Sequence, residues 1–172
     1  MKTFFKKHWG KFVYLMKHKY YVFHAGLKVK APLWRLIKHD WDKFLPSLWI
    51  PFADFYHGEG EPTEEVKKAH ALASLHHINL NDHHPQYWMF LDHSGNPCPQ
   101  PMPEAAIREM VADWLGMCKS VWGHWDTLTW FETQPPMVLK MHVETTKRVG
   151  EILAELYKEC SNGDRSRKEI LD

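Results

Sequence analysis

The sequence lacks any long hydrophobic run. A membrane-spanning helix needs roughly 18 apolar residues in succession, and no stretch of this chain approaches that length. The N-terminal stretch MKTFFKKHWGKFVYLMKHK interrupts its aromatic residues with lysines. It therefore does not have the apolar core of a secretory signal peptide. We predict a protein that is neither inserted in a membrane nor secreted.

Cysteine is scarce as well. The three cysteines, Cys98, Cys118 and Cys160, are far apart and include no C-x-x-C pair. This spacing argues against both a disulfide framework and a cysteine-bound zinc site. The pattern favours the reducing cytoplasm, which would be the host cytoplasm if the protein is encoded by a phage.

Several well-known functional motifs are missing. The chain contains no G-x-x-x-x-G-K-[ST], no G-x-G-x-x-G and no H-E-x-x-H. A glycine-rich phosphate loop and the commonest zinc-protease site are thus unsupported. Strand-like alternation of useful length and internal repeats are also missing, so the predicted fold class is all-α.

The chain is long enough for one domain. It has 172 residues, of which 44% are hydrophobic and 14% aromatic, and this is ample material for a core. We predict a single helical bundle over residues 1–160 and a polar tail over 161–172, with a loop and a small hairpin near 94–96. About six or seven helices are expected, over 3–30, from 32 to 44, 46–56, from 63 to about 83, 104–123 and 143–159.

Charge is unevenly distributed along the chain. Residues 1–43 contain eleven Lys or Arg and two acids, and the rest of the chain contains 19 acids and eleven basic residues. Nucleic acid is a conceivable partner for the basic part but is not favoured, because its lysines alternate with aromatic residues as in an amphipathic helix. We predict that this helix packs against its own domain through Val13, Met16, Tyr20, His24, Leu27 and Ala31.

Histidine is unusually abundant. The chain contains thirteen histidines, about three times the usual share. His24, Asp40 and Asp113 interrupt predicted apolar stripes, where a carboxylate without a partner costs several kcal/mol. Taken one at a time, these residues could simply be salt-bridged acids and a hydrogen-bonded core histidine. Taken together, they suggest a metal site.

The stretch LIKHDWDKF over 36–44 is similar to the L-x-H-D-x-x-K signature of the HD-domain superfamily of metal-dependent phosphohydrolases. Proteins of that superfamily have a histidine, then a His-Asp doublet, then optional histidines and a late aspartate. Here the corresponding residues are His24, His39-Asp40, a histidine cluster and Asp113. His39 follows His24 by only 15 positions, which is shorter than is common in the superfamily and requires a tight turn.

Two further motifs resemble an uncharacterised, often phage-encoded family of unknown function. They are HHINLNDHHPQYW, which begins at His76, and EMVADW over 109–114. The resemblance extends from about His18 to the last helix.

The HD resemblance implies one or two divalent transition-metal ions, Mn, Fe, Co or Zn, with Mg as a further candidate. His77 and His84 would complete a second metal site. Most other histidines of this cluster, His70 above all, could instead form structural hydrogen bonds or be exposed to solvent. His76 and His83 would contact the metal ligands or a substrate phosphate and take part in catalysis. The implied ligand set is His24, His39, Asp40, His77, His84 and Asp113.

The predicted function is hydrolysis of a nucleotide or a related phosphoester by metal-activated water. Asp40 would bridge two ions and act in catalysis with Lys43. Arg35, Lys38 and Lys43 would neutralise the substrate phosphate. Two alternatives are a di-iron oxygenase of HD type and a non-catalytic protein that binds a nucleotide. The substrate and the oligomeric state are left open.

Overall fold

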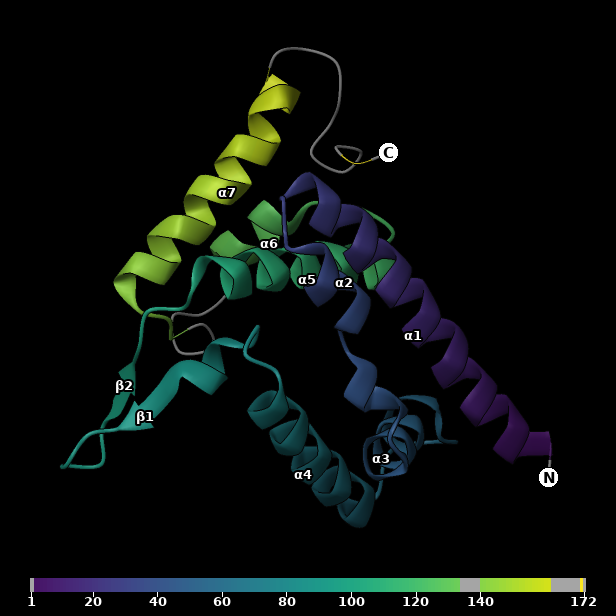
Figure 1. The fold of residues 1–172 in the computed structure, drawn as a ribbon. Coiled ribbons are helices and arrows are strands. Elements are labelled where there is room, and N and C mark those ends of the chain that lie inside the picture. Colours follow the sequence, from purple (N-terminus) through teal and green to yellow (C-terminus); the bar gives the residue numbers. More distant parts are fainter. Residues whose placement is uncertain (1, 134–139, 162–170, 172) are drawn as a thin grey trace.

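A computed structural model describes residues 2–133, 140–161 and 171 of the chain (Figure 1). The described residues form seven α-helices, two short 3₁₀ helices and one β-hairpin, so the predicted all-α class is confirmed. None of the described helices has both the length and the apolar character needed to cross a membrane. In chain order the elements are α1 (Lys2–Lys28), α2 (Leu33–Lys38), η1 (Trp41–Phe44), α3 (Pro46–His57), α4 (Glu64–Leu80), η2 (Pro85–Trp88), β1 (Met89–Leu91), β2 (Pro97–Pro99), α5 (Glu104–Trp122), α6 (Thr127–Thr133) and α7 (Val143–Ser161).

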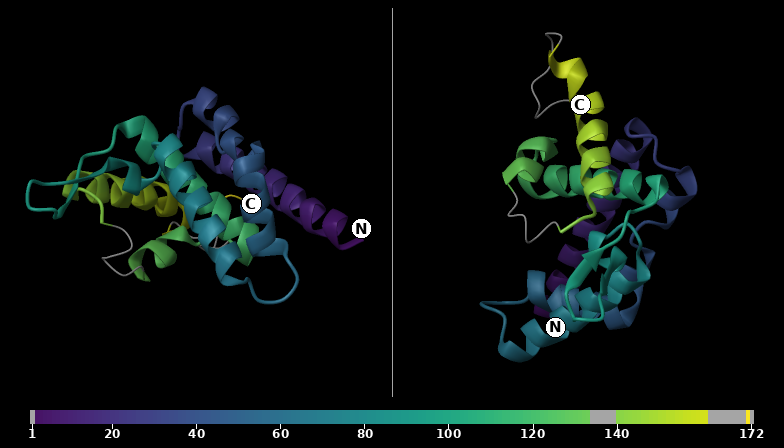
Figure 2. Two further views of the ribbon diagram at one scale, coloured as in Figure 1. Left: turned by 90° about the horizontal axis from the view of Figure 1, so that it is seen from below. Right: turned by 90° about the vertical axis from the view of Figure 1, so that its left-hand side faces the viewer.

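Helices α1 and α5 form the centre of the larger hydrophobic core. They pack closely because a glycine stands at their crossing. A Cβ atom added at Gly116 would lie 2.8 Å from the backbone nitrogen of Val22. Helix α7 packs on α5 on the side away from α3 and α4, and it completes this core with Val149 and Leu153 (Figure 2).

A smaller core joins α3 to α4. It consists of Leu48 and Phe52 from α3 and Ala73 from α4. Thr63 caps the start of α4 by accepting a hydrogen bond from the backbone N–H of Val66 at 3.4 Å. The short helix η1 contacts both α3 and α4 and follows α2 in the chain.

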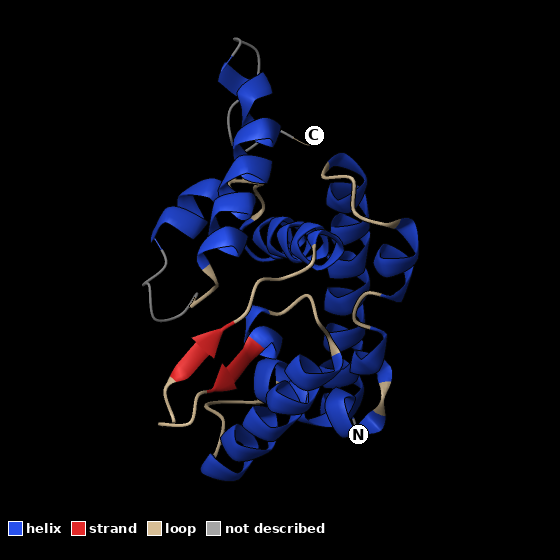
Figure 3. Ribbon diagram, turned by 60° about the vertical axis from the view of Figure 1, so that its left-hand side comes forward, coloured by secondary structure: helices blue, strands red, loops and turns tan. Residues whose placement is uncertain are grey.

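The predicted hairpin is present at one side of the helical body (Figure 3). Strands β1 and β2 are antiparallel, with Phe90 opposite Cys98. Asp92 holds the connecting turn by accepting hydrogen bonds from the backbone N–H groups of Ser94 and Asn96, each at 2.8 Å.

The inward face of α1 differs from the predicted one. Val13, Met16, Tyr20 and Leu27 are exposed, and Tyr20 retains 67% of its accessible surface. The physical reason is that α1 has apolar residues on two opposite faces, and the face with the smaller side chains fits closely against α5. The buried face consists of Lys11, Leu15, His18, Val22, Ala25 and Val29.

Two predicted helix ends are also corrected. The second helix ends at Lys38, and the chain reverses at Asp40, whose φ of 58° is left-handed. Helix α4 ends at Leu80, three residues before the predicted end, because Asn81 leaves the helical conformation. The predicted polar tail, 161–172, lies outside the described residues except for Ser161 and Leu171.

Candidate metal centre

Asp40 lies at the centre of a cluster of histidines and carboxylates. The left-handed turn after α2 points its side chain inward, where only 1% of the residue is exposed. Its Oδ2 lies 3.5 Å from His18 Nε2 and 3.6 Å from His39 Nε2. Its Oδ1 lies 3.4 Å from His77 Nε2. The two oxygens of one carboxylate therefore face two different groups of ligands.

The first group combines His18 from α1, His39 and Asp40 from the turn after α2, and Asp113 from α5. Asp113 Oδ1 lies 3.0 Å from His18 Nε2 and 3.4 Å from His39 Nε2. Metal–ligand bonds of about 2.0–2.2 Å place neighbouring ligand atoms roughly 3.0–3.6 Å apart. The ligand atoms of His18, His39 and Asp113 all lie within 4.8 Å of one another, so these three residues could hold one divalent ion, with Asp40 Oδ2 beside the two histidines.

The second group lies on the other side of Asp40. His77 Nε2 and His84 Nε2 are 2.9 Å apart, and His77 Nε2 also faces Asp40 Oδ1. His77 and His84 do not share a helix, because α4 ends at Leu80, between them. The turn over 81–84 brings His84 back towards His77 instead. The ring of His83 lies 4.3 Å from that of His84, so a third imidazole borders this group.

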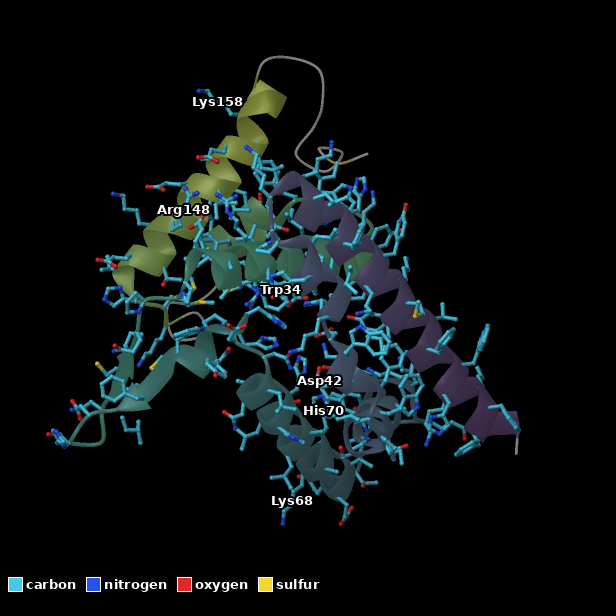
Figure 4. The ribbon with its side chains drawn as sticks, viewed as in Figure 1. Trp34, Asp42, Lys68, His70, Arg148 and Lys158 are labelled. Atoms are coloured by element: carbon cyan, nitrogen blue, oxygen red, sulfur yellow. The ribbon has the colours of Figure 1, made fainter. Side chains whose placement is uncertain are left out.

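Two carboxylates that the sequence analysis missed orient the histidines. His39 Nδ1 donates to Glu109 Oε1 at 3.0 Å, and His77 Nδ1 donates to Asp42 Oδ2 at 2.6 Å. His83 Nδ1 also faces Glu109 Oε1, at 3.3 Å. Figure 4 shows Asp42 among the side chains that fill the space between α4 and α1. Such carboxylates fix the ring and leave its other nitrogen for a metal.

The charges of the cluster favour a cation. Burial would raise the pKa of Glu109, but hydrogen bonds from His39 and His83 outweigh it and hold this pKa well below its usual range. Burial would lower the pKa of His39, but Asp40, Asp113 and Glu109 outweigh it and raise the pKa to about 10. Without a metal, a proton on His39 therefore compensates the buried carboxylates.

The pKa of His84 is shifted in the opposite direction from that of His39. Burial, together with the nearby His83, lowers its pKa to about 3. The ring is therefore neutral at pH 7, which is the form that binds a metal ion.

Unpartnered atoms inside the cluster provide a direct test of whether metal ions fit. His39 Nε2 and Asp40 Oδ1 are buried, and among the described residues neither has a hydrogen-bond partner. Buried polar atoms are normally paired. Both atoms face the other ligand atoms of the cluster, as metal ligands would. The residues present could therefore hold one ion in each group, and Asp40 faces a histidine of each.

Lys43 lies at the edge of this centre, as predicted. Its Nζ is 2.7 Å from Asp40 Oδ2, and its side chain is 18% exposed. Burial would lower the pKa of Lys43, but the charges of Asp40 and Asp113 raise it above the ordinary value. The ammonium group is therefore charged beside the carboxylate that both ligand groups share.

Arg35 and Lys38 line a separate pocket of about 210 Å³ next to His83 and Glu109. Arg35 is not free to bind a phosphate, because its guanidinium is paired with Glu109 and Asp82. It acts in this structure as a support for Glu109. Lys38 is exposed at the pocket.

Two predicted site residues lie elsewhere. His24 is on a different side of α1 from His18, and its Nε2 lies 3.0 Å from the carbonyl oxygen of Leu171. His76 is on the exposed side of α4. The prediction of His24 as a ligand is therefore wrong, since the buried face of α1 brings His18 to the site instead. His76 has no place in the cluster, because α4 directs His77 inward.

Replacing Glu109 with glutamine tests the orienting role. The glutamine amide is neutral, so it lacks the negative charge that holds the rings of His39 and His83. We therefore expect zinc or manganese to bind about tenfold to a hundredfold more weakly. Competition with a chelator measures this affinity. The matched control is Glu104→Gln on the same helix, whose carboxylate pairs with Arg148 at the surface. Equal affinities for the two variants would contradict the role of Glu109.

The fold and the site define the class: an all-helical protein with a buried centre rich in histidine and carboxylate, whose side-chain groups could hold a metal ion. A family model matches residues 7–155, so the chain belongs to a family of unknown function, DUF5662. No curated protein and no solved structure shows significant similarity to this chain.

Proposed function

We propose that the protein is a metal-dependent phosphohydrolase that acts on a nucleotide or a related phosphoester. The observation that carries this proposal is the position of Asp40. One of its oxygens faces His18 and His39, and the other faces His77. A carboxylate shared by two ligand groups is typical of two-metal centres that act on phosphate esters.

The similarity of 36–44 to the HD signature supports the same reading, with His18 in the place predicted for His24. His39 follows His18 by 21 positions, so the short spacing that results with His24 does not arise. The HD-domain assignment itself stays a prediction.

Metal ions and protein side chains would have different roles in this reaction. Bound divalent ions would lower the pKa of a water molecule and polarise the phosphoryl oxygens. Asp42 and Glu109 hold His77 and His39 with their Nε2 atoms turned to the centre. Lys43 supplies positive charge beside Asp40, where the charge of a phosphoryl group would develop. We assign this activity to the cytoplasm, in line with the scarce cysteines.

A second candidate function is a di-iron oxygenase. Its support is the number of imidazoles: His77, His84 and the neighbouring His83 suit iron better than magnesium. The hydrolase ranks first because Lys43 supplies a complement for phosphate. A non-catalytic nucleotide-binding role is the third alternative and predicts binding without turnover.

Purified protein tests the proposal directly. We expect one or two transition-metal ions for each chain, and release of phosphate from at least one compound of a nucleotide and phosphoester panel with Mn²⁺, Co²⁺ or Zn²⁺. Product separation and metal analysis measure both. Two irons with O₂ consumption would favour the oxygenase, and tight nucleotide binding with no product under every metal would favour the binding protein.

A further inference from the structure

A buried lysine next to the candidate metal centre has no role in the site described so far. Lys11 lies on α1 seven residues before His18, so both side chains are on the face that packs inward. Only 2% of Lys11 is exposed. Lysine is among the residues least often buried to this extent without an ionic partner.

The position of Lys11 does not provide such a partner. Among the described residues, no carboxylate oxygen lies within 4.0 Å of its ammonium group, which lies over the ring of Phe52 with the Nζ 4.8 Å from the centroid. Lys7, one turn earlier on α1, does form an ion pair, with Asp54. The chain thus pairs one lysine of this face and leaves the more deeply buried one unpaired.

This arrangement is unfavourable for the folded protein alone. Burial, and after it the charge of Lys43, lowers the pKa of Lys11 to about 8. A cation–π contact with one ring offsets only part of the cost of taking an ammonium group out of water. Lys11 therefore does not have the features of a residue kept for stability.

A second ammonium group lies against the same ring. Lys43 Nζ is 5.8 Å from the Phe52 centroid and 2.7 Å from Asp40 Oδ2. The charges of Asp40 and Asp42 raise the pKa of Lys11, but burial and Lys43 outweigh them. Burial and the charge of Lys11 lower the pKa of both His57 and His70. The region beside the metal ligands thus contains two ammonium groups, and within the described part of the chain Lys43 has a carboxylate partner while Lys11 has none within 4.0 Å.

We propose that Lys11 and Lys43 form an anion subsite at Phe52 that binds a phosphate group of the ligand next to the metal centre. The subsite deepens the proposed function and rests on it for the identity of the substrate. An anion between the two ammonium groups would supply the negatively charged partner that Lys11 lacks. Lys43 connects the two sites, because it contacts both Phe52 and Asp40.

Inorganic phosphate is the probe for this subsite. Its affinity is measured by calorimetry on the full chain, both with the metal that the protein retains and after chelation. For Lys11→Met we expect binding about tenfold to a hundredfold weaker, in line with the loss of a charged hydrogen bond. Lys11→Arg retains the charge and restores most of the affinity.

The matched control is Lys6→Met. Lys6 is on the same helix and is exposed, so the variant makes the same change in net charge away from Phe52. We expect unchanged phosphate binding. Urea unfolding shows whether Lys11 is structural: removal of a buried unpaired charge should leave Lys11→Met at least as stable as the natural protein.

The outcomes separate this proposal from the hydrolase proposal. Wild-type protein that binds no phosphate, or Lys11→Met that binds it normally, overturns the subsite even if hydrolysis is found. So does an equal loss in Lys6→Met. Phosphate binding that depends on Lys11 supports the subsite even if no compound is hydrolysed. If hydrolysis is found, Lys11→Met should raise KM about tenfold or more and change kcat much less.

Discussion

Replacing Asp40 with asparagine is expected to abolish metal-dependent turnover and to leave the helical fold intact. Asp40 is the carboxylate shared by both ligand groups, so its loss should lower the metal content of both. Metal ions supply several kcal/mol to such reactions, so we expect a rate at least about a thousandfold lower. Metal analysis and the phosphate-release assay measure the two effects.

Asparagine is the informative replacement because of the backbone. Asp40 has a φ of 58°, a left-handed conformation that asparagine tolerates and most other residues do not. The variant therefore removes the charge without straining the turn. Asp54→Asn is the matched control, since Asp54 also pairs with a lysine, Lys7, but lies outside the cluster. Normal metal content and turnover in Asp40→Asn would remove the basis of the two-metal proposal.

Residues next to distinctive motifs were predictable from the sequence. His39, Asp40, His77, His84 and Asp113 were all proposed as ligands, and the structure brings them together. The doublet, the dense histidines and an acid inside an apolar helix are local signals. They identify side chains that need partners even when the fold is unknown.

The orientation of α1 was not predictable in the same way. A long helix with large aromatic residues on one face and smaller apolar residues on the other offers two candidate inward faces. The choice between them is made by close packing of α1 on α5 at Gly116, and this contact is not visible in a single sequence. A signal did exist, because the spacing from His24 to His39 is shorter than is common in the superfamily.

The orienting carboxylates were harder to find. Glu109 is four residues before Asp113, so both side chains are on the same face of α5. Asp42 follows Asp40 by two residues in a turn. Neither position reveals which histidine it contacts, since these partners come from other parts of the chain. Lys11 was not predicted as a site residue because a lysine among six others in the same helix is typical of a solvent-exposed surface.

A comparison of two histidines on one helix tests the corrected site. In His18→Ala we expect metal affinity to fall by more than the tenfold to hundredfold that an orienting partner contributes, because the Nε2 that faces Asp113 and Asp40 is lost. In His24→Ala we expect the metal content of the natural protein, since His24 contacts Leu171 instead. Both variants remove one imidazole from α1, so any general effect on the helix is shared. Metal analysis after dialysis against a weak chelator gives the ratio, and circular dichroism checks the fold. Loss of metal from His24→Ala with retention in His18→Ala would reverse the assignment and place the inward face of α1 where the sequence pattern first suggested.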